Sequence, residues 1–170
     1  MERTVIVTGS SSGIGRATVE AFLDEQWTVY ATARDTDDLD EFRGREGCRV
    51  DSLDVTVDDD VQRVVERVTD ETDRVDCVVN NAGYGQLGPV EDVPVERVRE
   101  QYDVNVLGPH RLVRAVLPEM RRQSDGTVIN VTSTAARVPF QGGGVYSGSK
   151  AALQATTEAL RAEVADEGID

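Results

Sequence analysis

The stretch TVIVTGSSSGIG, from Thr4 to Gly15, places a short β-branched run directly before a glycine-rich turn. β-Branched residues favour strands, and the turn is followed at once by residues at helical spacing. These residues are Ile14, Ala17, Thr18, Ala21 and Phe22. A strand, a tight loop and a helix that follow one another with no linker form the beginning of a βαβ unit. The stretch therefore predicts an α/β fold.

The glycines of this turn, Gly9, Gly13 and Gly15, favour a phosphate site. Glycine lets the backbone approach a ligand closely, and the free amides and dipole at the start of a helix favour an anion. A pyrophosphate suits this chemistry. The GxxxGxG spacing differs from the GxGxxG dinucleotide fingerprint, and by itself the segment is equally consistent with a glycine turn that only caps a helix.

The second predicted strand, residues 27–33, ends at Arg34, where the ribose of a cofactor would lie if the first turn holds its pyrophosphate. In a βαβ site an acid at this place accepts hydrogen bonds from a ribose 2′-hydroxyl, whereas an arginine can receive a 2′-phosphate. Neither Thr32 nor Ala33 is acidic. The sequence therefore favours NADP over NAD, although Asp35 follows immediately and could itself pair with Arg34.

The rest of the chain alternates between strand and helix patterns. Further strands are predicted at 49–55, 75–80 and 127–132, and helices are predicted after 56, across 91–123 with a break near Asp103, and from 146 to about 167. This alternation is typical of a doubly wound, Rossmann-like parallel sheet. The chain has no internal repeat or interdomain linker, so residues 1–170 are expected to form a single domain.

The segment after the third strand combines a helix start with a candidate ligand residue. Thr56 is predicted to cap the helix, with an apolar stripe made of Val57, Val61, Val64, Val65 and Val68. The aspartates at 58–60 are interpreted as a solvated first turn rather than a metal site. Asp54 is better placed for function, because strand ends in such sheets face the ligand.

The chain is strongly acidic, since 32 acidic against 18 basic residues give a net charge of −14. We do not expect nucleic acid as a partner, because binding it requires a basic surface. Abundant acids with a single lysine resemble proteins of salt-loving organisms, in which about 1 M salt screens charges beyond roughly 3 Å. Salt adaptation is a hypothesis that full stability in dilute buffer would contradict.

Features of membrane, secreted and metal-binding proteins are lacking. No apolar run approaches ~18 residues, and the N-terminus enters a strand pattern without the regions of a signal peptide. We expect a soluble, cytoplasmic protein with no membrane partner. Cys48 and Cys77 lack zinc-site spacing and stand in apolar or strand-like surroundings, so both are interpreted as packing residues and no metal is expected.

The segment 128–150 carries the candidate catalytic groups: Tyr146 stands four residues before Lys150, and Ser133 stands thirteen before Tyr146. Lys150 is the only lysine of the chain. A nearby fixed cation favours the phenolate form of a tyrosine, which makes the tyrosine a better acid and base near neutral pH. Tyr146 is therefore interpreted as the acid/base, although a tyrosine and lysine at this spacing are more often an exposed helical pair.

Several motifs, taken in order and spacing, resemble the short-chain dehydrogenase/reductase family over essentially the whole chain. They are TGSSSGIG (8–15), NNAG (80–83), Asn105 with Gly108, Ser133, and YSGSK (146–150). The resemblance is to the commonest subgroup of the family. The extended members, which include sugar epimerases, have a differently spaced glycine turn, and this argues against an epimerase.

The resemblance implies an NADP-dependent oxidoreductase that acts on a secondary alcohol or carbonyl. By resemblance, Tyr146 would exchange a proton with the substrate oxygen, Lys150 would lower the pKa of Tyr146 and bind the nicotinamide ribose, Ser133 would polarise the carbonyl, and Asn105 would hold a water that relays protons. The implied cofactor-binding residues are Thr8, Gly9, Ser11, Gly13, Ile14, Gly15, Arg34, Asp54, Val55, Asn81, Ala82, Gly83, Tyr146 and Lys150.

One departure from the family is the length of the chain. Members of the family continue with further strands and a substrate-covering segment, whereas this chain stops where the next strand should begin, with Ile169 as its first apolar residue. The fold is thus expected to lack the last strands, and a non-catalytic nucleotide-binding module or inactive fragment is the alternative function. By resemblance, the two long helices would form a homo-oligomer, either a dimer or a tetramer.

Overall fold

The computed structural model describes residues 3–170, which form one five-stranded parallel sheet with the order β3-β2-β1-β4-β5. The strands are β1 (Thr4–Thr8), β2 (Thr28–Ala33), β3 (Cys48–Ser52), β4 (Cys77–Asn80) and β5 (Thr127–Asn130). The order reverses at β1, which pairs with β2 on one side and β4 on the other. Ligands of open parallel sheets bind beyond the carboxyl ends of the strands at such a reversal, which here lies after Thr8 and Asn80.

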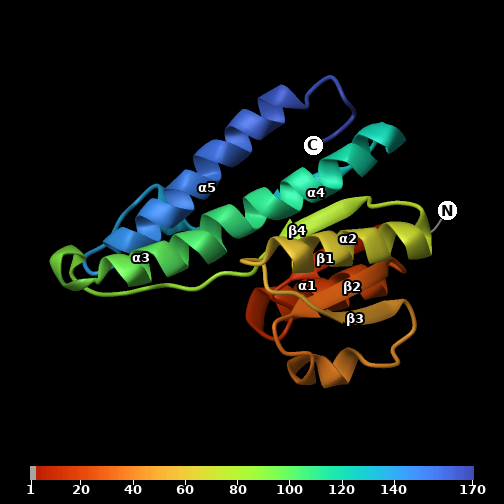
Figure 1. Cartoon of the computed structure of the whole chain (residues 1–170), viewed down its shortest axis with the longest axis horizontal. Coiled ribbons are helices and arrows are strands. Elements are labelled where there is room, and N and C mark those ends of the chain that lie inside the picture. The colour runs from red at the N-terminus through yellow and green to blue at the C-terminus, as the bar shows by residue number, and fades with distance from the viewer. Residues whose placement is uncertain (1–2) are drawn as a thin grey trace.

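Helices cover both faces of the sheet (Figure 1), which confirms the predicted Rossmann-like fold. The helix α1 and the 3₁₀ turn η1 contribute to one apolar cluster, while α2, α4 and the end of α5 contribute to the other. The bounds are α1 (Gly13–Asp24), η1 (Asp37–Phe42), α2 (Asp58–Thr72), η2 (Val90–Asp92), α3 (Val95–Tyr102), α4 (Gly108–Gln123), η4 (Thr134–Ala136) and α5 (Gly144–Glu163).

The central strand β1 is apolar because both of its faces are covered. Val5 and Val7 belong to the cluster that contains Val19 of α1, whereas Ile6 points to the cluster that contains Val64 of α2. All five side chains are fully buried. A strand that is buried on both faces has no polar alternation, and this is why the TVIVT run was recognisable as a strand.

The start of α2 differs from the prediction. The N-cap is Val57 rather than Thr56, and Val57 is exposed instead of joining the apolar stripe. The Thr56 hydroxyl donates to Asp54 Oδ1 at 2.7 Å, and the Thr56 amide donates to the same oxygen at 2.9 Å. The Thr56 side chain thus belongs to the turn before the helix, and the helix begins at Asp58, one residue later than predicted. The remaining stripe, Val61, Val64, Val65 and Val68, is buried as predicted.

Strand ends also differ from the predicted bounds. The third strand ends at Ser52 and the fifth at Asn130, earlier than the predicted ends at 55 and 132. After β5, the Val131 amide donates to Asn80 O at 3.0 Å, while Val131 O accepts from Lys150 Nζ at 2.8 Å. The backbone leaves the ladder at this point because its next partner is a side chain of α5.

The predicted break near Asp103 is a π-helical turn. Residues Asp103–Leu107 form this turn, η3, between α3 and α4. Gly108 follows it, and a Cβ on Gly108 would stand 2.8 Å from Val55 Cγ2, so the helix passes very close to the segment that follows β3. π-Turns within helices are frequent at functional sites, and this one carries Asn105.

The edge of the sheet beyond β5 is partly paired by the last residues. Ile169 forms a parallel bridge with Gly126, the Asp170 amide donates to Gly126 O at 3.0 Å, and the Val128 amide donates to Asp170 O at 2.7 Å. Ile169 is 5% exposed, whereas Ile129 on β5 is 41% exposed. Ile169 thus occupies the start of a sixth strand position, as the sequence predicts.

Within residues 3–170, no helix has both the length and the apolar character needed to cross a membrane. The same residues contain no cluster of histidine, cysteine or acidic side chains that could hold a metal ion. Cys77 is buried and Cys48 is partly buried, and both are free thiols. Burial raises the pKa of the Cys77 thiol to about 12, which suits a packing role for this residue.

Candidate active site

The glycine turn is packed directly against the loop that follows β4. Gly9 has a φ of +67°, and a Cβ there would stand 2.9 Å from the Ala82 Cα. A Cβ on Gly15 would overlap with Gly9 O and with Asn81 Nδ2. These two glycines therefore allow the turn after β1 and the NNAG loop to meet without space for a side chain between them.

Thr8 and Asn81 fasten these two loops together. The Thr8 hydroxyl accepts from the amides of Asn81 and Ala82 at 3.0 Å each, and Asn81 Nδ2 donates to Thr8 O and Gly9 O at 3.0 Å each. Thr8 is 1% exposed. Thr8 therefore fixes the shape of the turn, and its contact with a cofactor stays a prediction.

The start of α1 fits an anion. Its N-cap, Ser12, makes no side-chain capping bond, and its first turn holds no acid. The first turn of α2, by contrast, carries three aspartates. Gly13 has a φ of +53° and open space where a Cβ would be. The free amides at this helix start can donate to a pyrophosphate, and the open space beside Gly13 lets the phosphate approach them.

A cavity of about 1210 Å³ extends from this turn to α5. It brings together most of the predicted site residues: Gly9, Ser11, Gly13, Ile14, Arg34, Asp54, Val55, Asn81, Ala82, Gly83, Tyr146 and Lys150. Four predicted residues do not line it, namely Thr8, Gly15, Asn105 and Ser133. The candidate catalytic pair and the candidate phosphate site thus share one cavity although more than 130 residues separate them in the chain.

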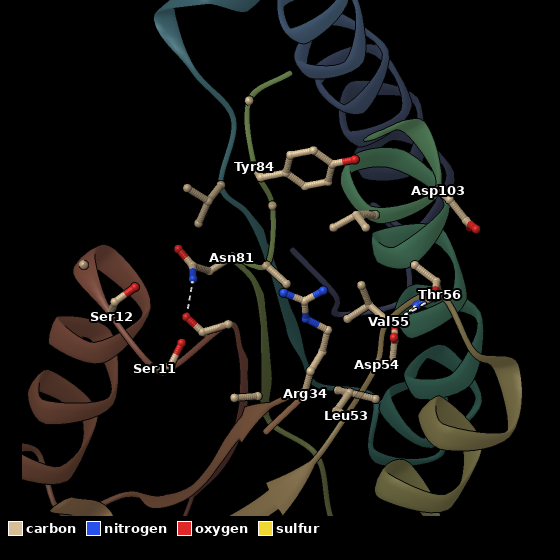
Figure 2. Close-up of a pocket in the computed structure, with 18 of the residues that line it drawn as sticks. Ser11, Ser12, Arg34, Leu53, Asp54, Val55, Thr56, Asn81, Tyr84 and Asp103 are labelled. Atoms are coloured by element: carbon tan, nitrogen blue, oxygen red, sulfur yellow. Dashed lines mark hydrogen bonds between the residues drawn. The ribbon is translucent and has the colours of Figure 1, made fainter. Parts of the chain in front are cut away.

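Arg34 points into this cavity from the end of β2, between Asn81 and Val55 (Figure 2). The structure gives its guanidinium no hydrogen bond or ion pair within residues 3–170. The alternative partner, Asp35, accepts instead from the Asp37 amide at 3.0 Å. Arg34 is therefore available to an anionic ligand, which is the arrangement that the sequence analysis favoured over an Arg34–Asp35 pair.

The Asp54 carboxyl lies near Arg34 in the cavity wall, where Figure 2 shows its bond to Thr56. Burial raises the pKa of this carboxyl, but the two hydrogen bonds from Thr56 and the positive charges of Arg34 and Arg111 outweigh burial, so the pKa is lowered. The Asp54 amide donates to Asp60 Oδ2 at 3.1 Å. The carboxylate is thus ionised near neutral pH and fixed at the cavity wall.

Lys150 is 5% exposed, and its Nζ donates to Val131 O at 2.8 Å. Burial lowers the pKa of this amine. No carboxylate forms a salt bridge with it among the residues that the structure describes. Tyr146 lies one helical turn earlier on α5, is half-buried, and lines the same cavity. The pair therefore faces the cavity and is not an exposed helical pair, which was the other interpretation of this spacing.

Asn105 connects three segments around this pair. Its Nδ2 donates to Tyr84 O at 2.9 Å and to Ser149 Oγ at 3.0 Å, and its Oδ1 accepts from the Tyr84 amide at 3.1 Å. The Ser149 hydroxyl donates to Tyr146 O at 2.7 Å. Both amide hydrogens of Asn105 are therefore used within the protein, and the residue positions the Tyr84 loop relative to α5.

Ser133 caps the short turn η4, where its Oγ accepts from the Ala135 amide at 3.1 Å. Accepting this bond leaves the hydroxyl proton free to donate. The side chain is partly buried and does not line the cavity within residues 3–170. Its chain neighbour Thr132 does line the cavity, so Ser133 stands one residue away from the lining.

Several residues that were not predicted as site residues shape the site. Tyr84, Gln86, Arg97 and Asp103 line the cavity, and Ser149 connects Asn105 to α5. A further arginine, Arg111 of α4, donates to Asp58, Asp103 and Val55 O and so connects α4 to the segment between β3 and α2. The only signal for Tyr84 and Gln86 was their position directly after NNAG. Arg111 lies inside a helix with no motif around it.

The buried amine makes a testable contribution to stability. In a Tyr146→Phe background, which removes the neighbouring phenol, we compare Lys150 with Lys150→Met by urea unfolding over a pH series. Between the lowered pKa of Lys150 and about 10.4, the unfolded lysine binds more protons than the folded one, so the stability of the lysine form relative to methionine rises with pH. A difference that falls with pH in this window would contradict the depressed pKa.

The fold and the cavity define a nucleotide-binding α/β protein of the doubly wound class. The sequence model described as short chain dehydrogenase matches residues 3–170. The chain is 37% identical over 169 residues to the short-chain dehydrogenase ptmH of Penicillium ochrochloron, covering 98% of this chain and 62% of that protein. The chain belongs to the short-chain dehydrogenase/reductase family, as the motifs of the sequence indicated.

Solved structures of short-chain dehydrogenases are similar to the chain in fold as well as in sequence. A short-chain dehydrogenase from Streptomyces avermitilis is similar with a TM-score of 0.95 and 40% identity, covering 99% of this chain and 62% of that one. A metagenomic short-chain oxidoreductase in complex with NADP gives a TM-score of 0.93 at 29% identity, covering 98% and 78%. The chain spans from 56% to 74% of the length of the curated relatives compared with it.

Proposed function

We propose that the chain is the nucleotide-binding and catalytic part of an NADP(H)-dependent oxidoreductase that acts on a secondary alcohol or carbonyl. The observation that carries this proposal is that Tyr146 and Lys150 line the same cavity as the open glycine turn and Arg34. Such a reaction needs from the protein an acid/base, a nearby amine and sites for the phosphates of the cofactor. Tyr146, Lys150, the glycine turn and Arg34 supply these groups.

The chemistry assigned to the chain is proton transfer and positioning. NADPH, when bound, supplies a hydride to the carbonyl carbon. Tyr146 gives a proton to the substrate oxygen in reduction and takes it back in oxidation. The Lys150 amine is fixed beside the cavity by its bond to Val131 O. Asn105 bonds both to the backbone of Tyr84 and to Ser149 of α5. These bonds fix the position of the loop after β4 relative to α5.

Ser133 is proposed to polarise the carbonyl. Its hydroxyl proton is free because Oγ already accepts from the Ala135 amide. A water near Asn105 is proposed to relay protons. It would donate to Asn105 Oδ1, which keeps one acceptor position after accepting from the Tyr84 amide. Homo-oligomerisation to a dimer or tetramer is a further proposal, which rests on the resemblance to the family. The cytoplasmic location stays a prediction from the sequence pattern.

Arg34 is proposed to select NADPH over NADH. Replacing Arg34 by Ala is expected to weaken NADPH binding by about 10- to 100-fold, since hydrogen bonds to charged groups contribute roughly 1.5–3 kcal/mol, and to change NADH binding little. Dissociation constants of both cofactors by calorimetry test this. Arg114→Ala, which removes an exposed arginine from α4, is the matched control for the loss of one positive charge. Equal losses for NADPH and NADH in Arg34→Ala would contradict the assignment.

A second candidate is a nucleotide-binding module without turnover. Two observations favour this candidate: the chain spans only part of the length of its curated relatives, and Ser133 does not line the cavity. Both functions predict cofactor binding, so absorbance at the NADPH band in the presence of a carbonyl panel separates them. NADPH oxidation that depends on the carbonyl supports the enzyme, and cofactor binding without any oxidation supports the module.

A further inference from the structure

Tyr146 belongs to one of two long uncharged segments of this acidic chain. Residues 77–90 and 138–149 contain no charged residue, although 29% of all residues are charged. Six of the ten large apolar side chains that residues 3–170 leave exposed lie in or beside these segments: Tyr84, Leu87, Val90, Val95, Val138 and Phe140. Exposed apolar side chains gathered in one place mark a site for a ligand or a partner.

The two segments are joined to each other. The Gly88 amide donates to Gly142 O at 2.8 Å. A Cβ on Gly144 would stand 2.6 Å from Val90 Cγ2, and a Cβ on Gly143 would overlap with the ring of Phe140. Leu87, Val90 and Phe140, which we call the apolar rim, therefore belong to one continuous surface.

The apolar rim continues into the cavity at the catalytic tyrosine. A Cβ on Gly85 would stand 3.6 Å from Tyr146 Cδ2 and 3.8 Å from Leu87 Cδ2, so one glycine separates the phenol ring from the leucine. Gly85, Gln86 and Tyr146 line the cavity, and Leu87, 60% exposed, lies just beyond. A molecule that occupies the cavity at Tyr146 and passes over Gly85 meets Leu87.

The segment that carries the apolar rim is held in place from behind. Both backbone groups of Tyr84 bond to the Asn105 side chain, and the Gln86 amide donates to Oε1 of Gln101, which is fully buried. A surface that is fixed before binding costs little entropy to order, so its apolar contacts translate into affinity.

We propose that the apolar rim binds the apolar body of the substrate, so that the enzyme takes ketones and secondary alcohols with alkyl or aryl groups in preference to polyols or anionic carbonyl compounds. This inference rests on the proposed function, because it uses Tyr146 as the point where the carbonyl lies. A second copy of the chain suits the apolar rim less well, because Glu91, Asp92 and Glu96 border it on a protein whose net charge is −14.

The test measures binding separately from turnover. The 170-residue chain is saturated with NADP⁺, which cannot give a hydride, and titrated by calorimetry or ligand-observed NMR with 2-butanone, 2-hexanone and 2-octanone. Each buried methylene is expected to strengthen binding by about fourfold, so two added methylenes give roughly 15-fold. Dihydroxyacetone, a polar ketone, is expected to bind more weakly than 2-butanone.

Leu87→Ser is expected to remove most of the gain between 2-butanone and 2-hexanone, whereas Ile129→Thr, which alters an exposed apolar residue of β5, leaves that gain unchanged. The NADP⁺-induced shift of the melting midpoint should be the same in both variants. Affinities that do not depend on ketone length, or a length dependence that survives Leu87→Ser, would overturn the proposal. Sedimentation that changes from dimer to monomer in Leu87→Ser with unchanged ketone affinities would also overturn it, in favour of a second copy.

The same titration without NADP⁺ separates this inference from the proposed function. If the chain binds no cofactor but its affinity for ketones still rises with ketone length, and Leu87→Ser removes this rise, the apolar site is retained and the proposed oxidoreductase is contradicted. A chain that binds NADP⁺ and transfers hydride, but shows no length dependence, retains the oxidoreductase and contradicts the apolar site.

Discussion

Tyr146→Phe is expected to lower the rate of carbonyl-dependent NADPH oxidation by about 10²- to 10⁴-fold, the usual contribution of a general acid or base. The phenyl ring keeps the packing against Gly85 and removes only the hydroxyl. NADPH binding should therefore remain, and the loss should be in kcat rather than in cofactor affinity. Steady-state rates at saturating NADPH, with the dissociation constant of NADPH measured separately, provide the test.

Tyr102→Phe is the matched control for this substitution. Tyr102 lies at the end of α3, where a Cβ on Gly148 would stand 2.8 Å from its hydroxyl oxygen, and it does not line the cavity. The control is expected to retain the wild-type rate. A Tyr146→Phe variant that oxidises NADPH as fast as wild type would remove Tyr146 from the reaction and leave the proposed chemistry without its acid.

Gly15→Ala is expected to have the largest effect on stability and on cofactor binding together. The added methyl group would overlap with Gly9 O and Asn81 Nδ2, and these are the atoms that join the glycine turn to the NNAG loop. Overpacking of this kind costs about 3 kcal/mol or more when the neighbour is backbone. The melting midpoint should fall by roughly 6–12 °C, and NADPH should no longer raise it.

Gly44→Ala distinguishes this effect from the general cost of replacing a glycine. Gly44 has a φ of +76° but nothing within 4 Å of the position of a Cβ, so only backbone strain of about 1 kcal/mol is expected. NADPH should still stabilise the control variant. If Gly15→Ala melts like Gly44→Ala and binds NADPH, the close contact between the turn and the NNAG loop has no role in forming the site.

The sequence was informative where local chemistry determines structure. The run at β1 is apolar because both faces of the strand are covered, and the glycines after it are required by contacts within a few ångströms. The Tyr146–Lys150 spacing places both side chains on one face of a helix. These features allowed the order of strands and helices, the family, and twelve of the cavity residues to be predicted.

The parts that could not be predicted depend on contacts between distant segments. The Thr8 hydroxyl accepts from amides more than 70 residues away, and no local pattern reveals these partners. The bond from Asn105 to Ser149 likewise crosses 44 positions. Thr56 was predicted as a helix cap because such residues commonly are, whereas here Asp54 competes for its hydroxyl.

The most direct test of the central claim, that the glycine turn, Arg34 and the Tyr146–Lys150 pair form one NADP(H) site, is a thermal melt of the chain in concentrated KCl with and without cofactor. A ligand at 100 times its dissociation constant contributes about 2.7 kcal/mol, which raises the midpoint by roughly 5–11 °C. We predict a cooperative transition that NADPH raises by this amount and that NADH, at the same concentration, raises less. A cooperative transition that neither cofactor shifts would contradict the claim.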